Sequence, residues 1–173
     1  MADNRNASLA DMLRSIFVIG LVVLALAGLG YWFQVKPGTK LEAVDYVTAA
    51  KAARGVSDFP IYTPASLPKG WKATSVNYTA GAKGAWHLGV LTDDEKYIGL
   101  EQTGSGRLKA IEDFSPDTEP KGSTKVGGFT WQLRQSGHGE TTLVREAGDI
   151  TIIVTGTAKR SVIEDYAAHL VTG

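Results

Sequence analysis

Hydrophobic residues are distributed along this chain in two different ways. Residues 15–35 form an apolar stretch without a single charged side chain, bounded by Arg14 and Lys36. Later segments alternate between apolar and polar positions, as half-buried strands do. The pattern therefore predicts a membrane helix followed by a domain rich in β-structure.

The apolar stretch has the length needed to cross a bilayer. A helix of 21 residues rises about 31 Å, close to the thickness of the hydrocarbon core. Tyr31, Trp32 and Phe33 lie at its C-terminal end, where aromatic side chains often meet the lipid headgroups. A cleaved signal peptide is one alternative, because residues 25–27 read Ala-Leu-Ala. A buried core helix is another, although helices of soluble proteins rarely run this long without a charge. The apolar residues continue past that site, which favours a membrane-spanning helix.

The charges beside this helix determine its orientation only weakly. Arg5 and Arg14 precede the helix, and Lys36 and Lys40 follow it. A short tail before a membrane helix and a full domain after it are typical of a signal anchor. We therefore expect a single-pass protein of the cell membrane, with residues 1–14 in the cytoplasm and the C-terminal domain outside.

Residues 36–58 are interpreted as a linker and a juxtamembrane helix. Asp45 can cap a helix over residues 46–54, and Gly55 can end it. Two proline-containing segments follow, at residues 59–64 and 67–71. Such segments are typical of the entrance to a β-domain rather than of its central strands, so we expect an extracytoplasmic domain over residues 59–173.

Six later segments have the alternation and the turn signals of β-strands. They cover residues 71–79, 85–92, 96–103, 129–136, 141–147 and 149–156. Hairpin turns are expected at residues 92–95 and 147–149. Residues 104–128 are rich in Gly, Ser and Pro and are expected to form a long loop with one helical turn near 107–113.

The C-terminal residues predict a helix. Ser161 and Glu164 have the spacing of a capping box. An apolar stripe at helical spacing follows, made of Val162, Ile163, Tyr166, Ala167 and Leu170. The expected fold class is therefore α+β: an N-terminal transmembrane helix, then an antiparallel β-sheet domain with a C-terminal helix packed on one face.

Composition removes several classes of function. Eighteen basic and eighteen acidic residues leave no net charge, which argues against a nucleic-acid binder. Cysteine is absent, so disulfides and thiolate chemistry are excluded. The three histidines lack metal-ligand spacing, and no G-x-S-x-G motif occurs. We therefore expect no metal, no cofactor and no enzymatic activity, and a hydrolase with a dispersed site is the remote alternative.

The hairpin over residues 85–103 carries the candidate chemistry. If Leu91 pairs with Lys96, Trp86 lies opposite Glu101 on the neighbouring strand, and His87 belongs to the other face. A shift of one residue would exchange the two faces. The assignment of each side chain therefore depends on the length of the turn.

Glu101 needs a partner if it lies among aromatic side chains, because a buried carboxylate is otherwise unfavourable. Arg145 and Arg134, on later strands, are available for an ion pair that fixes the sheet. A ligand-facing acid is the alternative interpretation.

Aromatic residues supply the other candidates. Trp71, Trp86 and Trp131 begin or occupy strands, where they either fill the core or line a groove for a lipid or glycan. The full set of candidate ligand or partner residues is Trp71, Trp86, His87, Tyr97, Glu101, Trp131 and Arg145.

Short motifs occur in order over most of the chain. They include Asp11-Met12-Leu13-Arg14-Ser15, Phe59-Pro60-x-Tyr62-x-Pro64, Leu67-Pro68-x-Gly70-Trp71 with Thr74-Ser75, Trp86-His87-Leu88-Gly89, Tyr97-x-Gly99-Leu100-Glu101-Gln102, Leu143-Val144-Arg145 and Val154-Thr155-Gly156-Thr157-Ala158. Each motif alone is weak, but the set resembles the actinobacterial DUF4245 proteins, a family of unknown function. The resemblance implies an exported, single-pass membrane protein and assigns no catalytic residue.

These observations together favour a binding role. We expect a membrane-anchored extracytoplasmic module that engages another envelope or membrane protein. A domain that binds a lipid or small ligand in a cavity of the sheet is the alternative.

Overall fold

The computed structural model of the protein describes residues 43–172. The expected cytoplasmic tail at 1–14 and membrane helix at 15–35 lie outside these described residues. Between residues 43 and 172, no helix has both the length and the apolar character that crossing a membrane requires.

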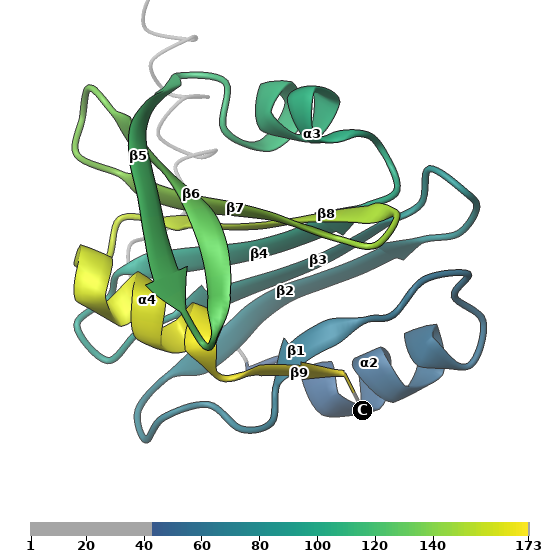
Figure 1. The fold of residues 1–173 in the computed structure, drawn as a ribbon. Coiled ribbons are helices and arrows are strands. Elements are labelled where there is room, and N and C mark those ends of the chain that lie inside the picture. Colours follow the sequence, from purple (N-terminus) through teal and green to yellow (C-terminus); the bar gives the residue numbers. More distant parts are fainter. Residues whose placement is uncertain (1–42, 173) are drawn as a thin grey trace, which may run out of the picture. The chain divides into compact units, whose positions relative to one another are not determined.

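Residues 43–172 form three helices and nine strands (Figure 1). In chain order they are α2 (Tyr46–Arg54), β1 (Tyr62–Pro64), β2 (Lys72–Thr79), β3 (Ala85–Leu91), β4 (Tyr97–Thr103), α3 (Arg107–Phe114), β5 (Thr118–Val126), β6 (Phe129–Ser136), β7 (Thr141–Ala147), β8 (Ile150–Gly156), α4 (Arg160–Ala168) and β9 (Leu170–Thr172). All six predicted strands are present within one residue of their expected bounds. The fold is α+β with an antiparallel sheet and a C-terminal helix, as predicted.

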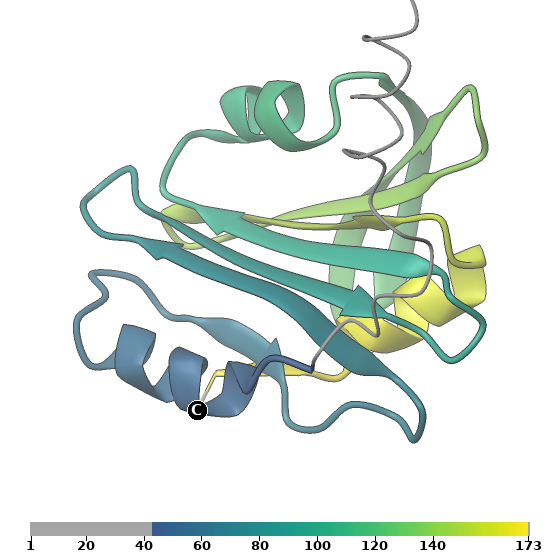
Figure 2. The same cartoon turned by 180° about the vertical axis from the view of Figure 1, so that it is seen from behind.

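The main sheet joins two meanders. Its strand order is β2-β3-β4-β8-β7-β6-β5, and every neighbouring pair is antiparallel. The chain forms β2–β4, crosses through α3, and returns as β5–β8, so that β8 lies beside β4. A second sheet pairs β1 with β9, which brings the start and the end of the domain together (Figures 1 and 2).

The two faces of the main sheet are covered differently. One face carries the main core, which includes the fully buried Trp86, Leu100 and Ile152 and packs against α2, α4 and β1. The opposite face, called the outer face here, is covered by α3 where it contacts β7 and β8. Figure 2 shows α3 on one side of the sheet and α2 and α4 on the other. Ile111 and Ile153 belong to the small apolar cluster beneath α3.

The first described helix confirms its predicted bounds. Asp45 caps α2, since its Oδ1 accepts a hydrogen bond from the Thr48 backbone N–H at 3.0 Å. Tyr46, Ala50 and Ala53 recur at helical spacing and lie buried in the main core. The folded unit therefore includes α2, ahead of the expected domain start at residue 59.

The expectation of a long loop over residues 104–128 is wrong. The helical turn is present as α3, but residues 118–126 form strand β5 at the edge of the sheet. Its central positions are exposed on both sides, so the apolar alternation that marks a half-buried strand is missing. Pro120 and the irregular register between Pro120 and Gly122 suit an edge strand, where an N–H is not needed on the outer side.

The capping-box prediction for the last helix is also wrong. Lys159 occupies the N-cap of α4 without a side-chain cap, and Ser161 lies inside the first turn. Glu164 instead accepts a hydrogen bond from Arg160 Nε at 2.8 Å. The apolar stripe is confirmed where Ile163 and Tyr166 enter the main core.

The register of the β3–β4 hairpin differs from the prediction by one residue. Leu91 pairs with Tyr97, not with Lys96, so residues 92–96 separate the paired residues instead of residues 92–95. The Thr92 backbone N–H donates to the Lys96 carbonyl at 2.9 Å, which leaves three residues in the loop. Glu95 takes a φ of 59°, the left-handed conformation common at the end of such loops.

This one-residue difference in register changes which residues of β3 and β4 are cross-strand partners, so the predicted pairs are wrong. Trp86 lies opposite Gln102, and both are fully buried on the core side. His87 lies opposite Glu101 on the outer face. Glu101 is therefore paired with His87, and the expected partners Arg145 and Arg134 make other contacts.

Candidate functional site

Three polar side chains form a continuous hydrogen-bonded chain on the outer face. They are Ser75 on β2, His87 on β3 and Glu101 on β4. Ser75 Oγ lies 2.8 Å from His87 Nε2, and His87 Nδ1 lies 2.5 Å from Glu101 Oε1. The arrangement places a hydroxyl, an imidazole and a carboxylate in line across three neighbouring strands.

This series of hydrogen-bonded side chains runs from the buried Glu101 toward the surface. Glu101 is 8% exposed and lies opposite Ile153 of β8, which packs beneath α3. The His87 side chain is 27% exposed, and Ser75 lies on β2 at the edge of the sheet. The carboxylate is thus held away from solvent, whereas Ser75 and His87 are only partly buried.

Two facing glycines make room for this arrangement. Gly89 of β3 pairs with Gly99 of β4. A Cβ atom on Gly89 would overlap Ser75 Oγ and would lie 3.2 Å from the Tyr97 hydroxyl oxygen. A Cβ on Gly99 would lie 3.0 Å from that same hydroxyl oxygen. Ser75 and the Tyr97 ring therefore occupy the space that side chains would otherwise fill.

An irregularity in β2 precedes Ser75. The register shifts between Ala73 and Ser75, so Thr74 is the extra residue of a bulge. Its hydroxyl donates to the Gly89 carbonyl at 3.3 Å. Bulges re-aim the side chains that follow them, and this one precedes the serine that reaches His87.

Glu101 sets the electrostatics of the cluster. Its hydrogen bond and its charge raise the pKa of His87, against the opposing effect of burial. Burial and the charge of Glu101 also raise the pKa of Tyr97, which keeps its hydroxyl protonated at neutral pH. A neutral His87 that donates from Nδ1 to Glu101 leaves Nε2 free to accept the Ser75 proton; a protonated His87 donates from both nitrogens.

Arg145 has a different environment from the one predicted. Its guanidinium carbon lies 4.2 Å from the ring centre of Phe129, 5.1 Å from that of Trp131 and 5.5 Å from that of Tyr62. These are cation–π distances, and no carboxylate is needed to hold the side chain. Arg145 is therefore part of the packing on the core side of β7.

The three tryptophans do not line a surface groove together. Trp86 and Trp131 are 0% and 1% exposed and lie in the main core. Trp71 is partly buried and stacks on Tyr166 of α4, with ring centres 6.3 Å apart. Of the seven candidate residues, His87, Tyr97 and Glu101 are the three that the structure brings together on the outer face.

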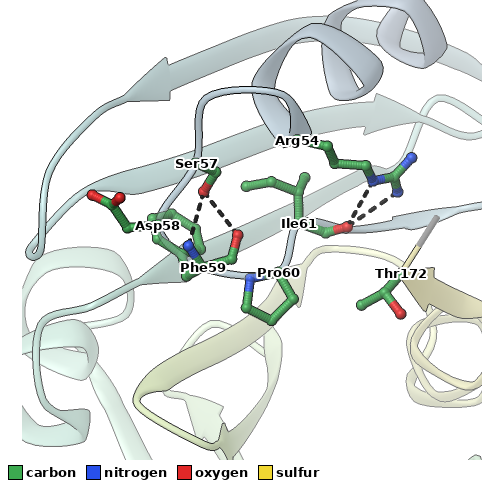
Figure 3. A pocket seen from close by; sticks show the side chains of 7 residues that line it. All are labelled: Arg54, Ser57, Asp58, Phe59, Pro60, Ile61 and Thr172. Carbon is green, nitrogen blue, oxygen red and sulfur yellow. Dashed lines mark hydrogen bonds between the residues drawn. The ribbon is translucent and has the colours of Figure 1, made fainter.

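A pocket of about 310 Å³ lies between the end of α2, the following loop and β9 (Figure 3). Arg54 lines it, but its guanidinium already donates to the Ile61 carbonyl at 3.0 and 3.2 Å and to Thr63 Oγ1 at 3.0 Å. Ser57 Oγ likewise donates to the Phe59 carbonyl at 2.8 Å. These polar groups stabilise the chain itself, which leaves little of their hydrogen-bonding capacity for a ligand.

A second, smaller pocket of about 170 Å³ borders Tyr97 but is lined by none of Ser75, His87 and Glu101. It lies between Tyr97, the segment that follows α3, and the end of β8. Tyr97 borders both this pocket and the two glycines. Within the described part of the chain, no group of three or more His, Cys, Asp or Glu side chains is arranged to hold a metal.

Comparison with known families confirms the resemblance that the sequence motifs indicated. The sequence profile of DUF4245, described as a protein of unknown function, matches residues 5–170. The chain belongs to the DUF4245 family. No curated protein and no solved structure matches it.

Sequence reasoning missed Ser75 in this DUF4245 protein. The serine stands in an ordinary strand, and only the bulge in β2 turns it toward His87. The pairing of His87 with Glu101 could have been considered from the sequence, since the polar residues at 92–96 allow Leu91 to pair with Tyr97 as well as with Lys96. Choosing the pairing with Tyr97 places the histidine opposite the acid.

Proposed function

We propose that this DUF4245 protein is a membrane-anchored module of the cell envelope that binds another envelope or membrane protein. The observation that carries the proposal is the hydrogen-bonded chain of Ser75, His87 and Glu101 on the outer face of β2–β4. The proposed binding surface is this part of the outer face together with Tyr97.

The cluster is ordered before any partner arrives. Each side chain has a fixed neighbour, so binding does not require the loss of much side-chain entropy. The Ser75 hydroxyl oxygen keeps a lone pair that can accept a hydrogen bond from a partner, whereas both imidazole nitrogens of His87 are already engaged by Ser75 and Glu101. Preorganised polar groups of this kind favour specific recognition.

Tyr97 supplies an aromatic anchor beside these polar groups. It is 37% exposed, and its ring rests against Gly89 and Gly99. Tyrosine is frequent among the residues that dominate protein interfaces, because it offers a large apolar area and a hydroxyl at low entropic cost. A tyrosine packed beside a polar cluster supports a protein partner over a partner that is bound through charge alone.

The proposed anchor is the uncharged stretch at residues 15–35. Its length suits one crossing of the bilayer, with the domain outside the cytoplasm. Extraction of native membranes at alkaline pH should leave the protein in the pellet. Added protease should digest the domain in intact spheroplasts, and digestion only after lysis would contradict the orientation.

Site-specific photocrosslinking tests the binding surface. A photoreactive phenylalanine analogue at position 97, and at Asn77 on the same part of β2, should crosslink one and the same membrane or envelope protein in native membranes. Position 129 is the matched control, because Phe129 is an exposed aromatic on a different part of the surface. The proposal also requires that His87→Ala reduces crosslinking from position 77. Equal crosslinking at position 129 would contradict it.

A small-ligand or lipid-binding role is the second candidate. The 310 Å³ pocket beside β9 supports it, since it has room for part of a ligand. Native mass spectrometry of protein purified from its own membranes in mild detergent distinguishes the two roles. A retained small mass supports the carrier, whereas a stoichiometric second protein supports the binding module.

A further inference from the structure

Ser75, His87 and Glu101 stand in the geometric relationship of a nucleophile, its base and the group that orients the base. The hydroxyl lies 2.8 Å from Nε2, within the range needed for proton transfer. The carboxylate lies 2.5 Å from the opposite ring nitrogen, Nδ1. Such a constellation is recognised by geometry and not by position in the sequence, so its occurrence on three antiparallel strands is no objection.

The burial of each group suits the role that the geometry assigns to it. Glu101 is the most buried of the three side chains, and it stabilises a positive charge on the imidazole. His87 is partly exposed at the surface side, where Ser75 lies on the edge strand. An electrophile can therefore approach the hydroxyl without displacing the carboxylate.

A hydrogen-bond donor stands beside the nucleophile. The place where a Cβ of Gly89 would lie is bordered by both Ser75 Oγ and the Tyr97 hydroxyl, so the two oxygens flank one spot above the glycine. A protonated tyrosine can donate to the oxyanion that forms when a carbonyl is attacked.

We propose that Ser75 is a nucleophile that transfers acyl groups from carboxylic esters to water, with His87 as its general base and Tyr97 as an oxyanion donor. Glu101 is a positioning residue that acts through His87. This activity goes beyond the proposed binding role and does not rest on it.

The reaction uses only the ester and water. The Ser75 oxygen bonds to the ester carbonyl carbon while its proton moves to His87 Nε2. The bond from that carbon to the alkoxy oxygen then breaks, and the proton on His87 passes to the departing alcohol. Water repeats the sequence on the acyl-serine, which releases the carboxylic acid and restores the serine hydroxyl.

A fluorophosphonate probe tests the nucleophile without a known substrate. The Ser75 oxygen would form a bond to phosphorus, fluoride would leave, and the hydroxyl proton would pass to His87. Full-length protein in mild detergent should gain one adduct in an intact mass spectrum, and peptide mapping should place it on Ser75. Ser75→Ala should abolish the adduct, whereas Ser123→Ala, which alters an exposed serine on β5, should not.

The supporting residues each have a distinct expected effect. His87→Gln should slow labelling roughly 100-fold or more, the usual contribution of a general base. Tyr97→Phe should slow labelling without changing its pH dependence. Glu101→Gln should shift the pH profile of labelling to lower pH, an effect that a purely structural contribution would not produce.

The pH dependence of labelling can be measured on the wild-type protein alone, so this test remains possible even if a substitution prevents folding. Labelling should increase with pH as His87 loses its proton and then level off. No adduct on folded wild-type protein, or a Ser75 adduct that forms equally fast in folded His87→Gln, would overturn the proposal. Since labelling requires no partner, a failure here leaves the binding role untouched, and a failed crosslink leaves the nucleophile untouched.

Discussion

His87 Nδ1 and Glu101 Oε1 lie 2.5 Å apart across the β3–β4 hairpin, where the two residues are direct cross-strand partners. The contact explains why a carboxylate is tolerated at 8% exposure beside the apolar cluster under α3. A charge-assisted hydrogen bond offsets much of the cost of burying the charge. The pair therefore links the stability of this hairpin to the protonation of one histidine.

The first prediction concerns the proton affinity of His87. Glu101→Gln removes the charge that raises the pKa of His87, so that pKa should fall when the imidazole is titrated by NMR. Glu119→Gln is the matched control, because Glu119 is an exposed acid on β5. A His87 pKa that is the same in wild type and Glu101→Gln would show that the pair does not form in solution.

The second prediction concerns stability and pH. Histidine in an unfolded chain has a pKa of about 6.5, and the pKa of His87 in the folded protein is higher. The folded state therefore binds the proton more tightly. The resulting stabilisation is complete below the unfolded pKa and is lost as pH rises through the folded pKa. Glu101→Gln should therefore lower the free energy of unfolding by about 1.5 kcal/mol at pH 6 and by less at pH 9.

Urea unfolding at both pH values measures this difference. Glu119→Gln should cost the same small amount at pH 6 and pH 9, since its carboxylate has no histidine partner. A loss for Glu101→Gln that grows with pH would have the wrong sign and would refute the linkage.

The sheet could be predicted from sequence wherever its strands bury apolar side chains. β3 and β6 bury mainly alternate residues, which gives a period of two, whereas β4, β7 and β8 bury residues on both faces and appear as runs of strand-forming residues between turns; all five were located within one residue. The same reasoning failed for β5, whose central residues are exposed. One signal for β5 was present: Gly127 and Gly128 both have positive φ values, and a Gly-Gly pair favours a two-residue hairpin turn.

The candidate site was only partly predictable, for a different physical reason. His87, Tyr97 and Glu101 were all identified as candidates. Which of them are cross-strand partners depends on the register of the hairpin, and the predicted register differed by one residue. Ser75 depends on a bulge in β2, which is set by tertiary packing and leaves no local pattern. Arg145 was expected to meet a carboxylate and instead lies among aromatic rings, because charge alone does not show which strand face a residue occupies.

The third prediction concerns Arg145 and Phe129. Their close approach, 4.2 Å from the guanidinium carbon to the ring centre, should appear as a coupling of about 0.5–1 kcal/mol in a double-mutant cycle, given that Phe129 is half exposed. Arg145→Met and Phe129→Leu keep most of the apolar contact while removing the charge and the ring. Chemical denaturation of the four proteins measures the coupling.

A second cycle provides the control for that coupling. Arg145→Met combined with Leu108→Ala should be additive, because Leu108 lies on α3 and is 79% exposed. A coupling with Phe129 that is no larger than the one with Leu108 would show that the ring does not hold the guanidinium.

The fourth prediction uses the two facing glycines as a matched pair. A methyl group on Gly89 overlaps Ser75 Oγ, so Gly89→Ala should turn the serine away from His87. The atoms nearest a methyl group on Gly99 all belong to Tyr97, so Gly99→Ala should displace the ring and leave the serine in place. The two variants add the same group at directly paired positions and differ in which neighbour must move.

The ¹⁵N chemical shift of His87 Nε2 reports the hydrogen bond from Ser75. Gly89→Ala should change this shift in the same direction as Ser75→Ala does, and should lower the free energy of unfolding by about 1 kcal/mol for the lost bond. Gly99→Ala should leave the Nε2 shift close to the wild-type value while altering the ring signals of Tyr97. If both variants change Nε2 equally, Tyr97 must take part in holding the imidazole, and the direct Ser75–His87 contact would not be sufficient to explain the cluster.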